Sequence, residues 1–545
     1  MVFVFPFLLK GQSLQCNWAY LPQGGNFYNA VISDSKIDQQ GDIVQLGRIF
    51  GVADLDPGTA ATDTSFSHPG YNYYVLKMDI SGHLLWVKYF RGIPSISTFE
   101  FNGLAINSQN EIIVLGNYFG MIDFDLSDSG VDTLRSHQPT YEDFFIAKYD
   151  AMGNYLWANN IGDATNRTVV KSMTLSANDE ILVTTDPIGA VDMDPSNAVH
   201  NTIGGNANLI CYDNNGNYVW HNNIVTTYSY GVDGKTLSAD GFNNTYLFSV
   251  GYYELTVNKF SQNGGRIWDK TIGDFTAGAR VTPQSILADT NNGGFYVCGT
   301  FEGSVDFDPG PAVVTRTSTG FSYQDLFVAK YDSTMNLLWV NAFAGEGSFG
   351  KSSLEYYGND LVLCGQLTGS IDFGSGFILN SNSIAPFYLK LSTSGITLDA
   401  FVLNGGGAFQ SIQVSQNNQM VMSGYVFSVT DMDPSAAVLN LTPSNATFFT
   451  SVYEPIPNSL LEPSGTIAFS VFPNPSIGGL YITSKGGEFA RVKIMDALGR
   501  LVYQSNSFLG TNYIDLSGQN EGIYFVHFQD GQHSQVVKRI ILTRE

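Results

Sequence analysis

Short stretches in which apolar and polar residues alternate recur in pairs along the chain. Alternation with a period of two predicts β-strands, and the Gly- and Asn-rich steps between paired stretches predict tight turns, so each pair indicates a β-hairpin. Five hairpins carry a tryptophan in their second strand and begin at Tyr73, Asp143, Asn208, Leu255 and Asp325. A sixth copy, from Phe387, has Asp399 in place of the tryptophan.

A second hairpin precedes each of these copies, so one repeating unit contains four strands. Four antiparallel strands that repeat about every sixty residues predict a β-propeller. The final unit starts at Ala408 and ends at Glu454 without a tryptophan strand, whereas the stretch from Cys16, which contains Trp18, matches that missing strand. We therefore predict an all-β chain with a seven-bladed β-propeller closed by its N-terminal strand, followed by a small C-terminal β-sandwich.

The tryptophans are predicted to be structural. Large rings at the same position of successive sheets are most simply buried between neighbouring blades, and aromatic character alone does not indicate a platform for sugars. The six positions are Trp18, Trp86, Trp157, Trp220, Trp268 and Trp339.

An Asp-x-Asp motif recurs where the second strand of a unit ends. In an extended chain residues two apart face the same side, so each pair presents two carboxylates that could begin a Ca²⁺ site. A turn is the favoured interpretation, because Asp accepts backbone N–H bonds and Pro-Gly sets a bend. The sixth unit keeps only Asp372. The paired positions are Asp54, Asp56, Asp123, Asp125, Asp192, Asp194, Asp306, Asp308, Asp431 and Asp433.

The segments that follow these aspartates vary most in length, notably 58–72, 129–143 and 310–325. In a propeller the connections from strand two to strand three, and from blade to blade, lie on one face. Variation of this kind favours ligand binding there. We expect a binding or adhesion protein whose glycan or protein ligand contacts this loop face.

No catalytic motif is found, neither GxSxG nor HExxH, P-loop or dinucleotide fingerprint. His68, His137 and His200 fall in variable loops, where histidines are usually solvated. Glycosidases act through paired carboxylates, and 43 acidic residues precede Phe469. A secreted glycoside hydrolase or lyase with axial carboxylates is the alternative function. No cofactor is expected apart from calcium at the Asp-x-Asp loops.

Composition narrows the classes of partner. The formal net charge is −23, and no basic cluster is present, which argues against nucleic acid and anionic membranes. From Phe469 onward there are 7 basic and 6 acidic residues, against 19 and 43 before it, so two differently composed units are implied. The four cysteines form no metal-binding spacing and are predicted to be buried thiols, with a disulfide as the alternative.

The N-terminal stretch has a short apolar run followed by polar residues, which is typical of a secretory signal and too short to span a bilayer. We expect cleavage around Ser13–Gln15. A lipoprotein signal that ends at Cys16 is the alternative. No other segment is apolar enough to cross a membrane.

The tail carries four ordered elements, "SVFPNPSIGGLYI", "VKIMDALGRLVY", "LSGQNEGIYFVHF" and "VVKRIILTRE". Together they resemble the C-terminal sorting domain of type IX secretion in Bacteroidota, and "DFDPG" with "AKYDxxGNxLW" resembles secreted bacterial propeller repeats. The matching tail positions are Pro473, Asn474, Pro475, Asp496, Gly499, Arg500, Gly522, Tyr524 and Lys538.

The resemblance implies a secreted or surface-attached protein, recognised by an outer-membrane translocon and then processed by a sortase-like peptidase. The expected organisation is a signal peptide at 1–15, the propeller at 16–455, a Pro/Ser-rich linker at 456–468 and the sorting domain at 469–545.

Overall fold

The computed structural model assigns every regular element that it describes as a β-strand. The chain divides into two compact units, Met1–Glu454 (the large unit) and Pro455–Glu545 (the tail unit). The residues described are 14–22, 31–50, 54–57, 71–92, 98–127, 130–138, 141–163, 166–187, 189–196, 198–202, 207–224, 236–250, 255–273, 279–290, 292–319, 324–343, 345, 348–435, 437–443, 446–456, 468–472, 476, 478–485, 490–496, 500–508, 511–529 and 535–543.

The described part of the large unit contains a series of antiparallel sheets, which we number in chain order. Sheet 1 contains β2 (Val31–Ile37), β3 (Ile43–Phe50), β4 (Tyr71–Met78) and β5 (Leu84–Gly92), and sheet 2 contains β6 (Thr98–Ile106), β7 (Ile112–Phe119), β10 (Asp143–Tyr149) and β11 (Tyr155–Ile161). Sheet 3 contains β12 (Thr168–Leu175), β13 (Ile181–Pro187), β14 (Ala207–Tyr212) and β15 (Tyr218–Ile224), and sheet 4 contains β16 (Leu237–Ala239), β17 (Thr245–Val250), β18 (Leu255–Phe260) and β19 (Arg266–Ile272).

Sheet 5 contains β20 (Arg280–Ala288), β21 (Phe295–Glu302), β24 (Asp325–Tyr331) and β25 (Leu337–Phe343), and sheet 6 contains β26 (Ser348–Tyr357), β27 (Asp360–Asp372), β28 (Ile378–Ser392) and β29 (Thr397–Val402). Short strands after the second strand of some sheets are β8 (Met121–Asp123), β9 (Thr133–Arg135), β22 (Ser304–Asp306), β23 (Thr315–Thr317), β32 (Thr430–Asp431) and β33 (Asn440–Leu441).

Sheet 7 joins the two ends of the large unit. Its strands are β30 (Gly407–Val414), β31 (Met420–Val426) and β34 (Thr447–Pro455), and its fourth strand is β1 (Leu14–Tyr20) from the other end of the chain. β1 begins two residues before the domain start expected at 16, and both Leu14 and Cys16 are buried in it. The Cys16 thiol donates a hydrogen bond to the Trp18 carbonyl, so the lipoprotein alternative would require this side chain to leave the core.

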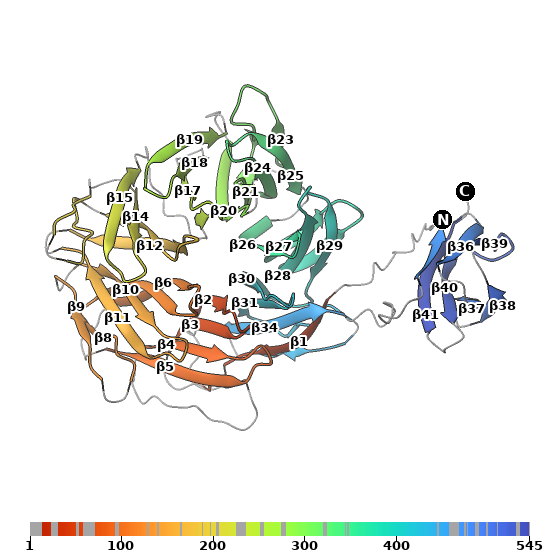
Figure 1. Cartoon of the computed structure of the whole chain (residues 1–545), viewed down its shortest axis with the longest axis horizontal. Coiled ribbons are helices and arrows are strands. Elements are labelled where there is room, and N and C mark those ends of the chain that lie inside the picture. The colour runs from red at the N-terminus through yellow and green to blue at the C-terminus, as the bar shows by residue number, and fades with distance from the viewer. Residues whose placement is uncertain are drawn as a thin grey trace. The chain divides into compact units, whose positions relative to one another are not determined.

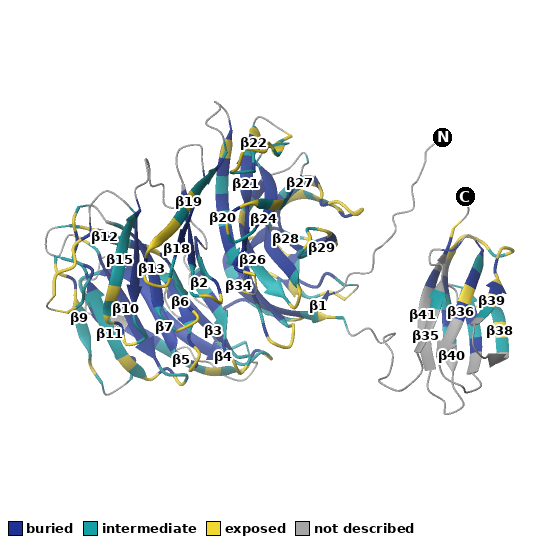
Figure 2. Cartoon of the chain, turned by 45° about the horizontal axis from the view of Figure 1, so that its top comes forward, coloured by how far each residue is buried: buried dark blue, intermediate teal, exposed yellow. Residues whose placement is uncertain are grey.

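Successive sheets pack against one another. The first strand of each sheet contacts the first strand of the next, and β30 of sheet 7 contacts β2 of sheet 1. These first strands lie towards the middle of the unit (Figure 1). The hydrophobic clusters combine residues of two neighbouring sheets, and one of them joins Val421 and Val452 of sheet 7 to Ile43 and Leu76 of sheet 1. Figure 2 shows the middle strands largely buried, as expected for sheets covered on both faces.

The tryptophans lie between these sheets. The Trp220 side chain covers Gly264 in the turn of the next sheet, where a Cβ would come within 2.6 Å of the indole, and the φ of +77° at Gly264 also suits glycine. Equivalent pairs are Trp18 with Gly82, Trp86 with Gly153, Trp157 with Gly216 and Trp339 with Gly395. The indole N–H of Trp18, Trp220, Trp268 and Trp339 donates to a carbonyl in the turn of the following sheet.

In sheets 1 to 6 a β-bulge precedes the tryptophan position, which Asp399 occupies in sheet 6. The register shifts where the third and fourth strands pair, which leaves one residue unpaired. These residues, which we call the outer bulges, are aliphatic and 43 to 55% exposed; they are Leu85, Leu156, Val219, Ile267, Leu338 and Leu398. Because the fourth strand is a sheet edge, a bulge there blunts pairing with another chain.

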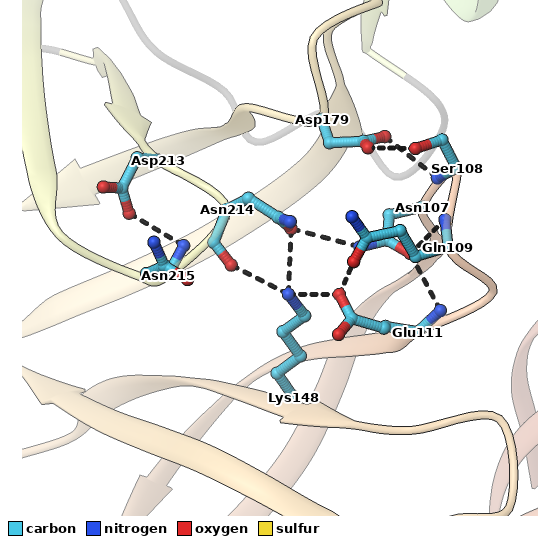
Figure 3. A network of polar contacts seen from close by, with 9 residues as sticks. All are labelled: Asn107, Ser108, Gln109, Glu111, Lys148, Asp179, Asp213, Asn214 and Asn215. Carbon is cyan, nitrogen blue, oxygen red and sulfur yellow. Dashed lines mark hydrogen bonds and ion pairs between the residues drawn. The ribbon is translucent and has the colours of Figure 1, made fainter.

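Buried lysines of the third strands link neighbouring sheets. Figure 3 shows Lys148 of sheet 2, whose ammonium pairs with Glu111 of its own sheet and donates to the carbonyl and side-chain oxygens of Asn214 in sheet 3, at 2.9 and 3.0 Å. In the same network Ser108 donates its N–H to Asp179 of the sheet 3 turn. A buried ammonium is tolerated here because all its neighbours are oxygen acceptors.

The tail unit contains two sheets that share one core. The first contains β35 (Ala468–Phe472), β36 (Gly479–Lys485) and β39 (Thr511–Asp515), and the second contains β37 (Ala490–Asp496), β38 (Leu501–Phe508), β40 (Gly522–Gln529) and β41 (Gln535–Leu542). Leu480 and Ile514 of the first sheet pack with Ile494 and Val526 of the second.

Candidate functional site

The first aspartate of each Asp-x-Asp pair holds the ends of its loop together. Asp306 Oδ1 accepts the N–H of Asp308 at 3.1 Å and the N–H of Val314 at 2.8 Å. Asp123, Asp192 and Asp431 make the same two types of bond, and Asp54 makes the first of them. The second aspartate accepts a further N–H two residues on in four of the loops.

These loops also dock onto neighbouring strands. The carbonyl between the two aspartates accepts the hydroxyl of a buried tyrosine of the third strand, as with Phe307 and Tyr331 at 2.8 Å. The preceding sheet adds main-chain contacts, such as Asn404 with Asp431. The carboxylates are therefore used as backbone acceptors, which matches the turn interpretation. Within the described residues no group of three His, Cys, Asp or Glu side chains is arranged to hold a metal ion.

The loop histidines do not converge. His68 lies outside the described residues. His137 Nδ1 lies 2.8 Å from the buried Asp143 carboxylate, and this hydrogen bond raises the pKa of His137 against the opposing effect of burial. His200 stacks on Tyr218 of its own sheet. Of the variable segments, 58–70 also lies outside the described residues, as do parts of the other two.

A second set of bulges lies in the first strands. The register between the first and second strands skips one residue in sheets 1, 2, 3, 5 and 7 and two in sheet 6. We call the skipped residues the inner bulges; they are Ser33, Asn102, Lys171, Gln284, Lys351 with Gly350, and Gln410. Apart from Gly350 every one has a polar side chain, and the next residue is a serine in four sheets, at Ser172, Ser285, Ser352 and Ser411.

A glycine in the second strand makes room for the inner bulge. Gly116 pairs with Phe101 next to the bulge at Asn102, and a Cβ at Gly116 would lie 2.3 Å from the Glu100 carbonyl. The same close approach occurs at Gly299 and Gly424. A glycine inside a strand is the sequence signal that could have located the bulge, since it often marks a bulge or a close approach of two backbones.

The first strands of all seven sheets line one cavity of about 580 Å³, which we call the axial cavity. The inner bulges Ser33, Asn102, Lys171, Lys351 and Gln410 contribute to its wall. Its volume is in the range of small-molecule sites. Sequence analysis placed the binding residues in the loops and did not identify this lining.

Both signs of charge occur in the axial cavity. Asp34 accepts the N–H groups of Ser35 and Leu104 at 2.9 and 3.1 Å, and its carboxylate lies 4.0 Å from the Lys36 ammonium. Glu100 and Lys171 also line the cavity, and neither makes a hydrogen bond or ion pair with a described residue. The wall therefore offers charged groups of both signs to a ligand.

Among the described residues that line the cavity, two serines have a buried hydroxyl without a hydrogen-bond partner. Ser353 is 3% exposed and Ser411 lies beside its bulge, and both line the axial cavity. Buried hydroxyls are usually hydrogen-bonded, so these two are exceptions, and both oxygens are shielded from the cavity.

The tail residues singled out in the sequence fall at strand ends. Arg500 pairs with Asp496 at 2.6 Å, and the Tyr524 hydroxyl donates to the Asn520 carbonyl at 2.7 Å. Gly522 begins β40, and Lys538 lies in β41. Pro473, Asn474, Pro475 and Gly499 lie outside the described residues.

Comparison with solved structures gives remote likenesses. A protein of unknown function from Dyadobacter fermentans is 9% identical with a TM-score of 0.39, and the match covers 82% of this chain and 100% of that one. A fungal alcohol oxidase of the AA5 family in complex with copper is 9% identical with a TM-score of 0.38, covering 96% and 100%. No curated protein matches the sequence.

Residues 470–543 match the secretion system C-terminal sorting domain. Within the described residues the structure has no helix of the length and apolarity needed to cross a membrane. The four tail elements lie within or at the edge of the matched region, so the two observations concern the same segment. The chain carries a type IX secretion sorting domain of the kind found in Bacteroidota, which interacts with that machinery and directs export to the cell surface or the extracellular space.

Proposed function

We propose that the large unit is a seven-bladed β-propeller closed by β1, and that it binds an extracellular ligand in the axial cavity. The ring of contacts between first strands, including β30 with β2, supports the architecture. The inner bulges support ligand binding. They occur at equivalent positions of several sheets, and most of their polar side chains, which differ from sheet to sheet, line the same cavity. Bulges of this kind are common next to active and binding sites.

Closure is tested by removing β1. Trp18 donates to the Ile80 carbonyl of sheet 1 and Gln15 donates to the Glu454 side chain of sheet 7, so the strand contacts both sheets. A chain that starts at residue 23 is expected to melt at least 10 °C below one that starts at residue 10, because one hydrophobic interface is opened. Equal melting temperatures would reject closure by β1.

Binding is tested on a glycan and protein array with the full chain, with and without calcium. The cavity variant Asn102→Ala/Gln410→Ala should lose the ligand that the native chain captures, whereas the outer-bulge variant Leu156→Ala/Leu338→Ala should retain it. Loss only on substitution of Val131 and Val313 in the Asp-x-Asp loops would place the site on the loop face and overturn the axial assignment.

The enzyme alternative is less favoured by the geometry. Among the cavity carboxylates Asp34 is held by two N–H groups and a lysine, and Glu355 accepts the N–H of Tyr356. Glu100 and Glu355 come from sheets 2 and 6, which are not neighbours. A glycosidase needs two carboxyl groups about 5–10 Å apart across the scissile bond.

The sorting role of the tail is expected to be separable from binding, with the sortase-like peptidase as a further partner. A fusion of residues 456–545 to a periplasmic reporter should reach the cell surface or the medium in a host with type IX secretion. Retention of the fusion in the periplasm would contradict this assignment.

A further inference from the structure

The inner bulges carry positive charge at two of their positions. Lys171 in sheet 3 and Lys351 in sheet 6 are the charged members, and the others are neutral serine, amide or glycine residues. Both lysines are exposed. At the level of the bulges the axial cavity therefore presents cations and neutral polar groups, although the chain as a whole is strongly acidic.

Hydrogen-bond donors accompany these lysines. The side-chain oxygen of Asn102 accepts a hydrogen bond from the amide of Asn117 at 2.8 Å, and the Asn102 amide nitrogen makes no hydrogen bond with a described residue. Gln410 lines the same cavity, and its side-chain amide makes no hydrogen bond with a described residue. Side-chain amides both donate and accept hydrogen bonds, and they suit a ligand that carries hydroxyl groups.

The three acidic residues of the lining, Asp34, Glu100 and Glu355, are not themselves inner bulges; Glu355 follows the Lys351 bulge by four residues and accepts the N–H of Tyr356. Glu100 precedes the Asn102 bulge by two residues and lies near the start of β6. At this end of the strand Thr98 pairs with Phe119, and the Asp-x-Asp loop follows Phe119. Glu100 therefore lies on the loop side of the bulge. Asp34 and Lys36 follow the Ser33 bulge and lie 4.0 Å apart, so they largely offset one another.

We propose that the axial cavity binds an acidic sugar, a small saccharide that carries a carboxylate and several hydroxyl groups. The lysine ammoniums take the carboxylate, and the amides of Asn102 and Gln410 contact the hydroxyls. A cavity of about 580 Å³ is far larger than a bare inorganic anion requires. This inference rests on the proposed axial binding site and adds the chemical class of its ligand.

The test uses calorimetry on the full chain with a trisaccharide of uronic acids, its neutral hexose counterpart and inorganic phosphate as probes. The uronate trisaccharide should bind, and the neutral one should bind at least about tenfold more weakly, because charge-assisted hydrogen bonds are lost. Lys171→Met should weaken uronate binding by about tenfold or more. Lys88→Met, which changes a lysine of β5 that does not line the cavity, should leave it unchanged.

Glu100→Gln provides the opposite change at the same site. Removal of this carboxylate should tighten uronate binding and leave the neutral probe unaffected, an outcome that damage to the fold would not produce. Thermal midpoints of all variants are measured alongside.

The two proposals fail differently. Equal binding of the neutral and acidic probes, abolished by Asn102→Ala/Gln410→Ala, would overturn the acidic-sugar assignment and keep the axial site. Phosphate binding as tight as uronate binding would show a bare anion site and also overturn it. Uronate binding that survives Lys171→Met/Lys351→Met and Asn102→Ala/Gln410→Ala would overturn both.

Discussion

The inner and outer bulges are the same backbone device at opposite edges of the same sheets, and their side chains differ in kind. The outer bulges are uniformly aliphatic and face solvent, whereas the inner bulges vary among serine, asparagine, lysine, glutamine and glycine and mostly line one cavity. Uniformity across repeats indicates a demand that every sheet shares. Variation at one equivalent position indicates that the sheets contribute unequally to a single occupant.

Each bulge has a partner that explains its location. An outer bulge is followed by the tryptophan position, and the indole covers a glycine of the next sheet. An inner bulge is matched by a glycine in the second strand wherever the pair approaches closely, as at Gly116. If the outer bulges serve the architecture and the inner bulges serve binding, substitutions at the two sets should differ in their effect on stability.

The largest effect is expected where the outer bulge meets the sheet interface. Trp339→Ala should lower the free energy of unfolding by about 2–4 kcal/mol, because the half-buried indole packs on Gly395 and bonds to the Thr393 carbonyl. The neighbouring Leu338→Ala removes a side chain that is 55% exposed and should cost less than about 1 kcal/mol. If both variants lose a similar free energy of unfolding, measured by heat or urea, the tryptophan and the outer bulge do not differ in their contribution to stability.

The glycine beneath an inner bulge should come next. Gly116→Ala places a Cβ 2.3 Å from the Glu100 carbonyl and should destabilise by about 2 kcal/mol, because backbone rather than a flexible side chain must move. Gly265→Ala is the matched control, since its closest neighbour is the Ser261 hydroxyl at 3.2 Å. A Gly116→Ala chain as stable as the control would show that the bulge does not need the glycine.

A smaller effect is expected at the loop end of the third strands, where His137 contacts Asp143 and Thr319 contacts Asp325. The pKa of His137 is raised in the folded state, so its contribution is fully present below the unfolded pKa of about 6.5 and is lost as the pH rises through the folded value. Because the ring is 43% exposed, the contribution should stay below about 1 kcal/mol.

The measurement is thermal stability between pH 5.5 and 8.5 for the native chain and for His137→Thr. This variant introduces the residue type that sheet 5 has at the equivalent position, Thr319. The native chain should lose its advantage over the variant as the pH rises. Parallel pH profiles would show that His137 does not titrate against Asp143.

The smallest effect on stability is expected at an inner bulge itself. Gln410→Ala removes a side chain that makes no hydrogen bond with a described residue, so the free energy of unfolding should change by no more than about 0.5 kcal/mol. Loss of ligand binding without loss of stability would support a binding role for the inner bulges, distinct from the structural role of the outer bulges. A drop as large as that of Trp339→Ala would mean that inner bulges are architectural too.

Much of the fold could be predicted from the repeated hairpins. Period-two alternation and Gly/Asn turns located the third and fourth strands, and the unfinished last unit led to the pairing of β1 with β34, which the sheet order contains. The turn interpretation of the Asp-x-Asp motif agrees with its hydrogen bonds. These features are local, or they repeat often enough for one copy to explain another.

The sequence by itself determined the all-β class, the four-stranded antiparallel sheets and the sorting domain, because alternation, turn residues and an ordered set of tail motifs are written along the chain. Only the tertiary structure revealed the axial cavity. Lys171 and Lys351 stand 180 positions apart in different sheets, and they share a wall only because seven first strands converge. A bulge is also invisible to simple alternation, since one unpaired residue shifts the register that alternation assumes.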